Sequence, residues 1–345
     1  MKKLILSVVT VISLTFAYAQ NIYTVNNAIG ITADFDNLQT AINTVPSNSI
    51  LLVHGSSFTY GNVVIRKPLT IVGPGYFLGS NAEPYTQANR IPATIGNIAV
   101  SAGSTGSLIT GLTVSGTINF DSTSNVTFSR NHANSSNSLY VNRSSNINII
   151  QNYLLVWLRF QNNSNVNLSN NVLTYNYFVD LNSGSSTNIS HNVIVRPTTS
   201  YGIVAAESGT SATISNNVVV KTGTGNSVGF CNNCAAGSSV TATNNISTDS
   251  IFRGSSNALI NVAVESIFAN YASPSAAPDA RFLLQEGSVA IGAGTGGADV
   301  GLFGGSAPYV LSGIPFIPNI YSLDVPTIGT TGTGLRIHVK AQTNN

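Results

Sequence analysis

The side chains best suited to chemistry in this 345-residue chain gather between residues 138 and 207. Trp157, the only tryptophan, stands two positions before Arg159 in a stretch that alternates apolar and polar residues as a strand does. Aligned on the repeats described below, the same outward face carries Tyr140, Phe178 and Asp180. Aromatic rings beside amides and a guanidinium suit a sugar polymer with uronic acids. We therefore expect polysaccharide binding at Tyr140, Trp157, Arg159 and Phe178, while an Arg159–Asp180 salt bridge beside half-exposed rings remains an equal alternative.

Asp180 and Glu207 are the candidate catalytic pair. They lie one repeat and two residues apart, which places their β-carbons about 8 Å from each other by strand spacing. This separation falls in the roughly 6.5–9.5 Å range of inverting glycosidases. However, we expect Arg159 to lower the pKa of Asp180, and nothing apolar near Glu207 would keep that carboxyl protonated. Binding without catalysis is the leading prediction, and a polysaccharide lyase or inverting glycoside hydrolase acting on an acidic polysaccharide is the alternative.

An internal repeat of about 20 residues positions these side chains. Six segments share a pair of alternate inward positions followed by an asparagine, for example Val166, Leu168 and Asn171. Both positions are apolar in five of them, and in the sixth Thr187 takes the first. The asparagines are 21, 19, 21, 25 and 28 residues apart. This period, with Gly, Ser and Asn at the turns, predicts an all-β fold, a single-stranded right-handed parallel β-helix. Stacked coils would pass amide hydrogen bonds along a buried ladder made of Asn131, Asn152, Asn171, Asn192, Asn217 and Asn245.

The repeat also predicts domain boundaries. We expect an N-terminal strand and capping helix over residues 20–49, a β-helix of roughly ten to twelve coils over 50–310, and a C-terminal capping tail over 311–345. Asp36 and Gln39 resemble a capping box before a short amphipathic helix that Pro46 ends. The Gly-rich stretch 292–305 and the Pro-rich stretch 314–326 break the repeat, and we expect them to fold back over the last coil.

The N-terminus reads as an export signal. Lys2 and Lys3 precede an apolar run and an Ala17-Tyr18-Ala19 end, which predicts a signal peptide over residues 1–19 and a secreted or cell-surface protein. The apolar run is too short to span a bilayer. Only 8% of the residues are charged, and without the signal the acidic and basic residues are equal in number, so nothing favours a nucleic-acid partner. We expect a monomer that does not span a membrane.

Two stretches resemble a known family. LQTAINTV with SILLVHGSSFTYGNVVIRKPLTIVGPG, within residues 38–75, is similar to the N-terminal cap and first coils of secreted bacterial right-handed β-helix proteins of the pectin-lyase-like superfamily. GSVAIGAGTGGADVGLFGG, residues 287–305, is similar to the closing segment of many of them. The resemblance implies the fold and leaves the activity open, because the superfamily includes lyases, hydrolases and binding proteins.

The catalytic motifs of that superfamily do not match. The Asn-Thr-Asp, Asp-Asp, Gly-His-Gly and Arg-Ile-Lys elements of polygalacturonases do not occur. The arginine motif of pectate lyases is approached only at Arg196, where Pro197 comes one place too early and Tyr201 replaces the second arginine. No catalytic residue carries over, and the resemblance implies calcium only if the protein is a lyase.

The cysteines and histidines add little chemistry. Cys231 and Cys234 cannot form a disulfide framework or a four-ligand zinc site, so a local disulfide and two inert thiols are the remaining alternatives. His132 and His191 follow the pattern of turn residues beside ladder asparagines, and no two histidines have metal-ligand spacing. We expect no metal site and no cofactor.

Overall fold

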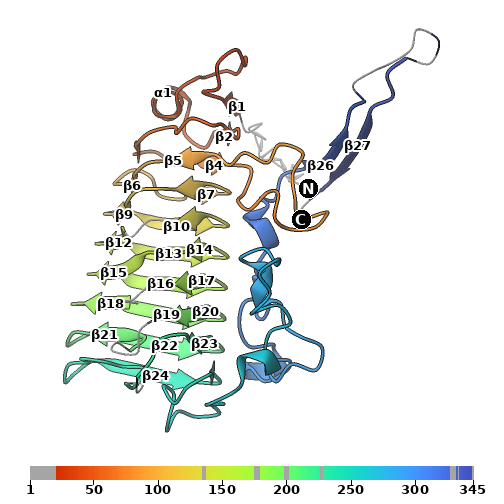
Figure 1. Ribbon diagram of the computed structural model, residues 1–345. Helices are drawn as coiled ribbons and strands as arrows, with labels where there is room; N and C mark the ends of the chain where they lie inside the picture. The colour runs from red at the N-terminus through yellow and green to blue at the C-terminus, as the bar shows by residue number, and fades with distance from the viewer. Residues whose placement is uncertain are drawn as a thin grey trace, which may run out of the picture.

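The structure is a computed structural model that describes residues 21–133, 137–174, 179–197, 202–225, 228–326, 332 and 334–343. The chain forms a parallel β-solenoid of about 8 turns with very little helix (Figure 1). This confirms the all-β, parallel β-helix prediction, although the expected ten to twelve coils were too many. The predicted signal peptide lies outside the described residues.

Three parallel sheets form the walls of the solenoid. The long sheet has ten strands, in spatial order β1 (Ile22–Val25), β2 (Ile50–Val53), β4 (Thr70–Val72), β7 (Leu108–Thr110), β10 (Ser124–Ser129), β13 (Ser145–Ile150), β16 (Ser164–Ser169), β19 (Ser186–Ser190), β22 (Ser211–Ser215) and β24 (Ser239–Thr243). The seven-strand sheet contains β3 (Val63–Ile65), β6 (Ile98–Val100), β9 (Ile118–Asp121), β12 (Ser138–Asn142), β15 (Trp157–Gln161), β18 (Val179–Asn182) and β21 (Val204–Ala206). The eight-strand sheet contains β5 (Thr94–Ile95), β8 (Thr113–Val114), β11 (His132–Ala133), β14 (Tyr153–Leu154), β17 (Val172–Thr174), β20 (Val193–Arg196), β23 (Val218–Lys221) and β25 (Ile246–Ser247).

Alternating apolar residues fill the interior of the solenoid. In β15, Leu158 and Phe160 are buried, while Trp157 and Arg159, which alternate with them, are partly exposed. The register aligns Leu139 of β12 with Leu158, and Leu158 with Val179 of β18. Like side chains therefore stack from coil to coil in one continuous core, which fixes the register because a one-residue slip would turn every apolar side chain outward.

The six asparagines of the repeat form a buried ladder. Each is 0% exposed. Asn171 shows the pattern, since its Oδ1 accepts hydrogen bonds from the backbone N of Asn152 at 2.9 Å and from that residue's Nδ2 at 3.0 Å. The Nδ2 of Asn171 donates to the carbonyl of Ile149 at 2.8 Å and to Oδ1 of Asn192 at 3.0 Å. The same bonds recur from Asn131 to Asn245, so the turn between the long and eight-strand sheets keeps its shape in each coil.

The residues directly before the ladder asparagines form a second column, and their backbone is left-handed. The residue before each ladder asparagine has φ between 53° and 58°, a conformation unusual outside glycine. This column consists of Arg130, Gln151, Asn170, His191, Asn216 and Asn244. The chain bends sharply there, and these side chains point to the outside of the solenoid, where several of them bind the C-terminal part of the chain.

The return segment, residues 261–318, runs back along the solenoid (Figure 1). Asn216 accepts a hydrogen bond from the backbone N of Thr295 at 2.9 Å. Two coils closer to the N-terminus, Asn170 donates to the carbonyls of Leu302 and Gly304, both at 2.8 Å. Arg130 donates to the carbonyl of Ile314 at 2.9 Å, so the contacts follow the coils in reverse order.

Apolar residues of the return segment cover the outer face of the eight-strand sheet. Val172, Val193 and Val218 on that face pack in a second core with residues such as Val300 and Leu302. The last strand of the three walls, β25, ends at Ser247. The expectation that coils continue to residue 310 and that the Gly-rich stretch caps the last coil is therefore wrong, because this stretch pairs with the side of the solenoid.

Buried polar contacts fasten the far end of the return segment. Asp279 is 0% exposed, and its carboxylate accepts hydrogen bonds from Asn81 at 2.9 Å and from the backbone N of Ser312 at 2.7 Å. The hydroxyls of Tyr76 and Tyr309 lie 2.6 Å apart. These contacts join the loop of residues 76–90 near the start of the solenoid to chain that comes 198 to 233 residues later.

The N-terminal helix α1 (Leu38–Thr44) covers the first coil. Asn37 caps it by accepting from the backbone N of Thr40 at 2.9 Å, so the cap lies one residue later than the expected Asp36. Gln39 does not complete a capping box. Its amide instead binds both backbone groups of Val64, accepting at 2.6 Å and donating at 3.1 Å, and so acts as a strand partner for the open edge of β3.

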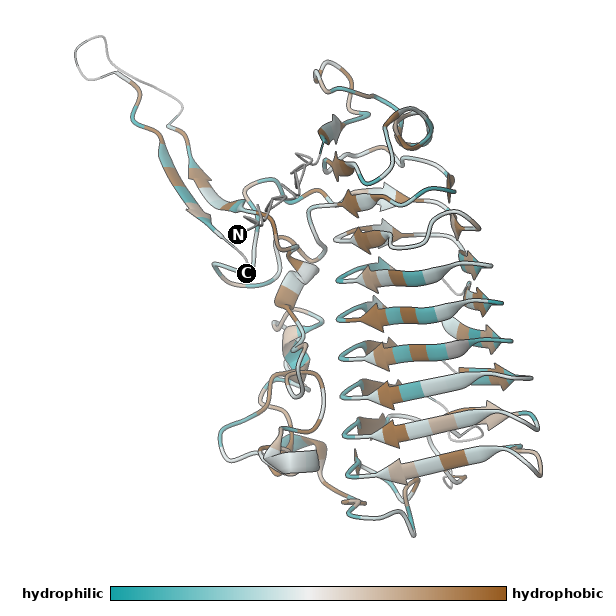
Figure 2. Cartoon of the chain, turned by 180° about the vertical axis from the view of Figure 1, so that it is seen from behind, coloured by the Kyte–Doolittle hydropathy of each residue, from teal (hydrophilic) through white to brown (hydrophobic). Residues whose placement is uncertain are grey.

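No helix among the described residues is long and apolar enough to cross a membrane. The chain closes with an antiparallel hairpin of β26 (Asn319–Asp324) and β27 (His338–Gln342), which extends away from the solenoid (Figures 1 and 2). Short 3-10 turns interrupt the preceding segment at Val264–Ser266, Ala280–Phe282, Thr295–Gly297 and Leu311–Gly313.

The histidine of β11 makes the fold sensitive to acid. His132 packs against the rings of Tyr76, Phe77 and Tyr153, and burial lowers its pKa from 6.5 to about 4. The folded state therefore favours the neutral ring, so its contribution is complete above pH 6.5 and is lost as the pH falls toward 4. Relative to His132→Phe, we expect the parent protein to lose up to about 3 kcal/mol of unfolding free energy between pH 7 and 4.

Urea denaturation at several pH values measures this difference. His54→Phe is the matched control, because the His54 side chain is exposed. If the unfolding free energies of the parent and His132→Phe depend on pH in the same way, the ring of His132 is protonated as easily in the folded protein as in the unfolded chain.

Candidate functional site

The outer face of the seven-strand sheet brings most of the expected site residues together. Tyr140, Arg159 and Asp180 are register partners on three successive coils, β12, β15 and β18. Trp157 lies two residues before Arg159 on the same face of β15. All four side chains are half-buried. Phe178, the fifth residue expected here, lies outside the described residues.

Arg159 is held by aromatic and acidic neighbours. Its guanidinium carbon lies 3.3 Å from the ring centroid of Trp157 and 6.0 Å from that of Tyr140. Its Nε lies 3.7 Å from Oδ2 of Asp180. The attraction of a cation for a π face and for a carboxylate both restrict the arginine, so less side-chain entropy is lost when it binds a further anion. One face of the Trp157 ring is covered by this contact.

The carboxyl of Asp180 has a raised pKa. Burial raises it, while the charge of Arg159 and the Trp157 side chain act in the opposite direction. Arg159 lowers the pKa of Asp180 as expected, but desolvation of this half-buried carboxyl is the larger effect, so the net shift is upward.

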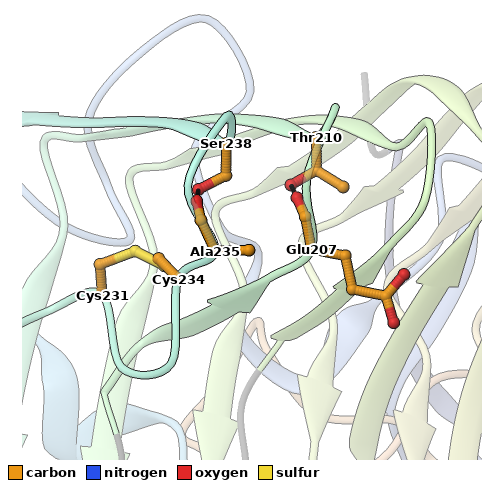
Figure 3. The surroundings of a disulfide bond; sticks show 6 residues. All are labelled: Glu207, Thr210, Cys231, Cys234, Ala235 and Ser238. Atoms are coloured by element: carbon orange, nitrogen blue, oxygen red, sulfur yellow. Dashed lines mark hydrogen bonds between the residues drawn. A yellow bond between two sulfur atoms is a disulfide. The ribbon is translucent and has the colours of Figure 1, made fainter.

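Glu207 is engaged in a turn. It follows β21 and is exposed, and its Oε2 accepts hydrogen bonds from the backbone N of Ser183 at 3.0 Å and from the Ser183 hydroxyl at 2.9 Å. Its backbone carbonyl accepts from the hydroxyl of Thr210 (Figure 3). The carboxylate thus ties the turn after β18 to the next coil, and it would have to leave Ser183 to act as an acid or a base.

Cys231 and Cys234 form a disulfide, with their α-carbons 5.8 Å apart (Figure 3). Of the two alternatives from the sequence, the local disulfide is the one present. Cys231 forms a parallel bridge with Val204, and the backbone N of Ala235 donates to the carbonyl of Ala206 at 2.8 Å. The disulfide loop therefore covers the open edge of β21 and ends the seven-strand sheet.

One ion pair beside this face escaped the sequence analysis. Asp121 of β9 forms a two-pronged ion pair with Arg143, at 2.7 and 2.8 Å. The register aligns Asp121 with Asn142, Gln161 and Asn182 in a polar column next to that of Arg159. Extending the repeat alignment by one coil toward the N-terminus would have found Asp121, because the Phe120 before it fits the apolar pattern.

Arg196, the nearest approach to a lyase arginine, is structural. It is 0% exposed and its Nη1 lies 2.9 Å from Oδ2 of Asp249. A buried, paired arginine cannot act as a base on a polymer. Among the described residues, no cluster of three or more metal-ligating side chains occurs.

No family model matches this chain, and no curated protein matches it either. The fold and the face described above therefore carry the functional argument.

Proposed function

We propose that this is an exported β-helix protein that binds polysaccharide or cell-surface glycan, without catalysis, on the outer face of the seven-strand sheet. The stacking of Arg159 on Trp157, 3.3 Å from guanidinium carbon to ring centroid, supports this proposal. A guanidinium fixed in this way offers its remaining N–H groups to a carboxylate or to hydroxyls. The predicted signal peptide supports the exported part of the proposal, and the aromatic and amide side chains beside Arg159 support the glycan-directed part.

The repeat of the solenoid suits a polymer. Successive coils are about 4.8 Å apart, so equivalent positions recur along the axis at the scale of a sugar ring. Asn142, Gln161 and Asn182 follow one another in register beside the arginine, and their amides can donate to and accept from hydroxyl groups. A chain with uronic acids that lies along the axis would meet Arg159 at one sugar and the amides at its neighbours.

Trp157→Ala should weaken binding of a soluble acidic polysaccharide by roughly 1–3 kcal/mol, because it removes the ring that holds Arg159. Arg159→Gln should weaken binding of polygalacturonate more than that of an uncharged polysaccharide. Isothermal titration calorimetry measures both affinities, and thermal melts of the same variants measure stability.

Thr213→Ala, on the long sheet, is the control and should change affinity and stability by less than about 0.5 kcal/mol. If Trp157→Ala lowers the melting temperature and leaves affinity unchanged, the Trp157–Arg159 contact is structural. A parent protein that binds none of the polysaccharides tested would overturn the proposal.

The alternative is a lyase or hydrolase of acidic polysaccharide, in which Asp180, beside Arg159 and with a pKa raised by burial, is the candidate general acid. Release of reducing sugars and absorbance of unsaturated products, with added calcium and with a chelator, test this alternative. Activity that Asp180→Asn abolishes would favour the enzyme over the binding protein. Glu207→Gln tests the second carboxyl.

A further inference from the structure

The outer face of the seven-strand sheet carries more carboxylates than cations. Arg159 has Asp180 as its carboxylate partner, 3.7 Å from its Nε. Arg143, directly after β12, pairs with Asp121 of β9 at 2.7 and 2.8 Å. Glu207 has no cation partner among the described residues, and its side chain points away from the disulfide loop (Figure 3). From β9 to the turn after β21, the described residues of this face therefore include two arginines and three carboxylates.

Two of the carboxylates lie at the ends of an amide column, which consists of Asn142, Gln161 and Asn182. The register aligns these amides with Asp121, and Glu207 takes the next place in the column, directly after β21. Four coil spacings of about 4.8 Å separate the two carboxylate positions. A polymer that lies along the whole amide column therefore meets a negative charge at each end.

The next cation of this wall lies beyond the amide column. Arg66 follows β3 and is exposed, and the register places it two coils from Asp121 on the N-terminal side. Two coil spacings of about 4.8 Å exceed the Debye length of about 8 Å at physiological ionic strength. Arg66 therefore does little to offset the two carboxylates that bound the column.

The guanidinium of Arg159 can bind one carboxylate of a ligand. Its Nε faces Asp180 and its plane lies on Trp157, while its two Nη groups make no hydrogen bond with the described residues. Those groups can donate in parallel to a carboxylate. A carboxylate on the next sugar would come beside Asp180, and carboxylates further along would come beside Asp121 and Glu207. Like charges brought together in this way oppose binding.

We propose that this face selects polysaccharides whose uronic acids are separated by uncharged sugars, and that Asp121 and Glu207 are specificity-determining residues that disfavour polymers charged on every sugar. The inference rests on the proposed binding of glycan at Arg159. One uronic acid meets the guanidinium, and the hydroxyl groups of its uncharged neighbours meet the amide column. Specificity of this kind comes from repulsion of the wrong ligand as well as attraction of the right one.

Methyl esterification of polygalacturonate tests the selection, because it changes the number of charges on a constant sugar backbone. Isothermal titration calorimetry at physiological ionic strength, without divalent cations, compares polymers of equal length. The half-esterified polymer should bind most tightly. The unesterified polymer should bind about two- to fivefold more weakly, which is the effect of one surface charge pair. The fully esterified polymer should also bind more weakly than the half-esterified one, because it offers Arg159 no carboxylate.

Glu207→Gln should tighten binding of the unesterified polymer about two- to fivefold. It removes the charge, and the oxygen of the new amide can still accept from Ser183. Asp121→Asn should act in the same direction, because it removes the other carboxylate and frees Arg143. Glu286→Gln is the matched control, since Glu286 is exposed on the return segment, which covers a different wall. It changes the net charge by the same amount and should bind every polymer like the parent.

Two results would overturn the inference while leaving glycan binding in place. One is an affinity that rises steadily with the number of free carboxylates. The other is binding of the unesterified polymer by the Glu207 and Asp121 variants that is no tighter than by Glu286→Gln. Because the two variants lie at opposite ends of the amide column, loss of the fold in one leaves the other to decide. A parent that binds none of the polymers would overturn the proposed function and this inference together.

Discussion

Asp249→Ala is expected to lower the free energy of unfolding by about 3–5 kcal/mol, because it leaves the buried guanidinium of Arg196 without its anion. Arg196 is 0% exposed, and the ion pair measures 2.9 Å. Asp249 also accepts from the backbone N of Ile251 at 3.1 Å, so the substitution loosens the turn after β25 as well. Urea denaturation measured with a common m-value gives the difference.

The double variant Arg196→Met with Asp249→Ala separates the effect of the unpaired charge from the effect of the lost side-chain packing. Replacing both partners by apolar groups removes the unpaired charge, so the double variant should be more stable than Asp249→Ala alone. If the single variant unfolds at the same urea concentration as the parent, water reaches Arg196 and the pair is dispensable.

Asn171→Ala is expected to lower the free energy of unfolding by about 2–5 kcal/mol. Removing a buried amide from the middle of the ladder leaves several neighbouring groups without hydrogen-bond partners. The backbone N of Asn152 loses its acceptor, and Oδ1 of Asn192 loses a donor. The thermal midpoint and the urea midpoint should both fall, and the spectrum of the folded state should remain that of a β protein.

Asn167→Ala is the matched control, because Asn167 lies outward on the same strand, β16. Its amide donates to Asn148 at 3.4 Å and to Ser169 at 3.3 Å and accepts from Asn188 at 3.0 Å. These bonds lie on the half-exposed outer face, where water can replace the lost partner, so the free energy of unfolding should fall by less than about 1 kcal/mol. Equal losses for the two variants would mean that strand propensity, and not the buried ladder, determines the effect.

Much of the solenoid could be predicted from the sequence because each coil buries the same pattern of alternating apolar residues and one asparagine. A buried asparagine recurs every 19 to 28 residues, so the spacing identifies the coil and the register together. That register was enough to place Tyr140, Arg159 and Asp180 in one column. It could not show that the guanidinium of Arg159 lies on the Trp157 ring, because rotamers are set by three-dimensional packing.

The return segment and the hairpin were harder to foresee. The left-handed column that binds the return segment contains Arg, Gln, Asn and His, so no single residue type marks it in every coil. Its partners are mostly backbone carbonyls, which every residue has. The hairpin has the alternation of a strand pair, but Gly and Pro around it made the whole tail resemble an irregular cap.

The return segment changes how the solenoid can come apart. Coils of an isolated solenoid contact only their neighbours, so a terminal coil can open while the others stay folded. Here one stretch of chain binds Asn216 near the last coil and Arg130 near the middle, and its Tyr309 meets Tyr76 near the first. Opening one coil therefore disturbs a contact shared with distant ones, which makes unfolding more cooperative.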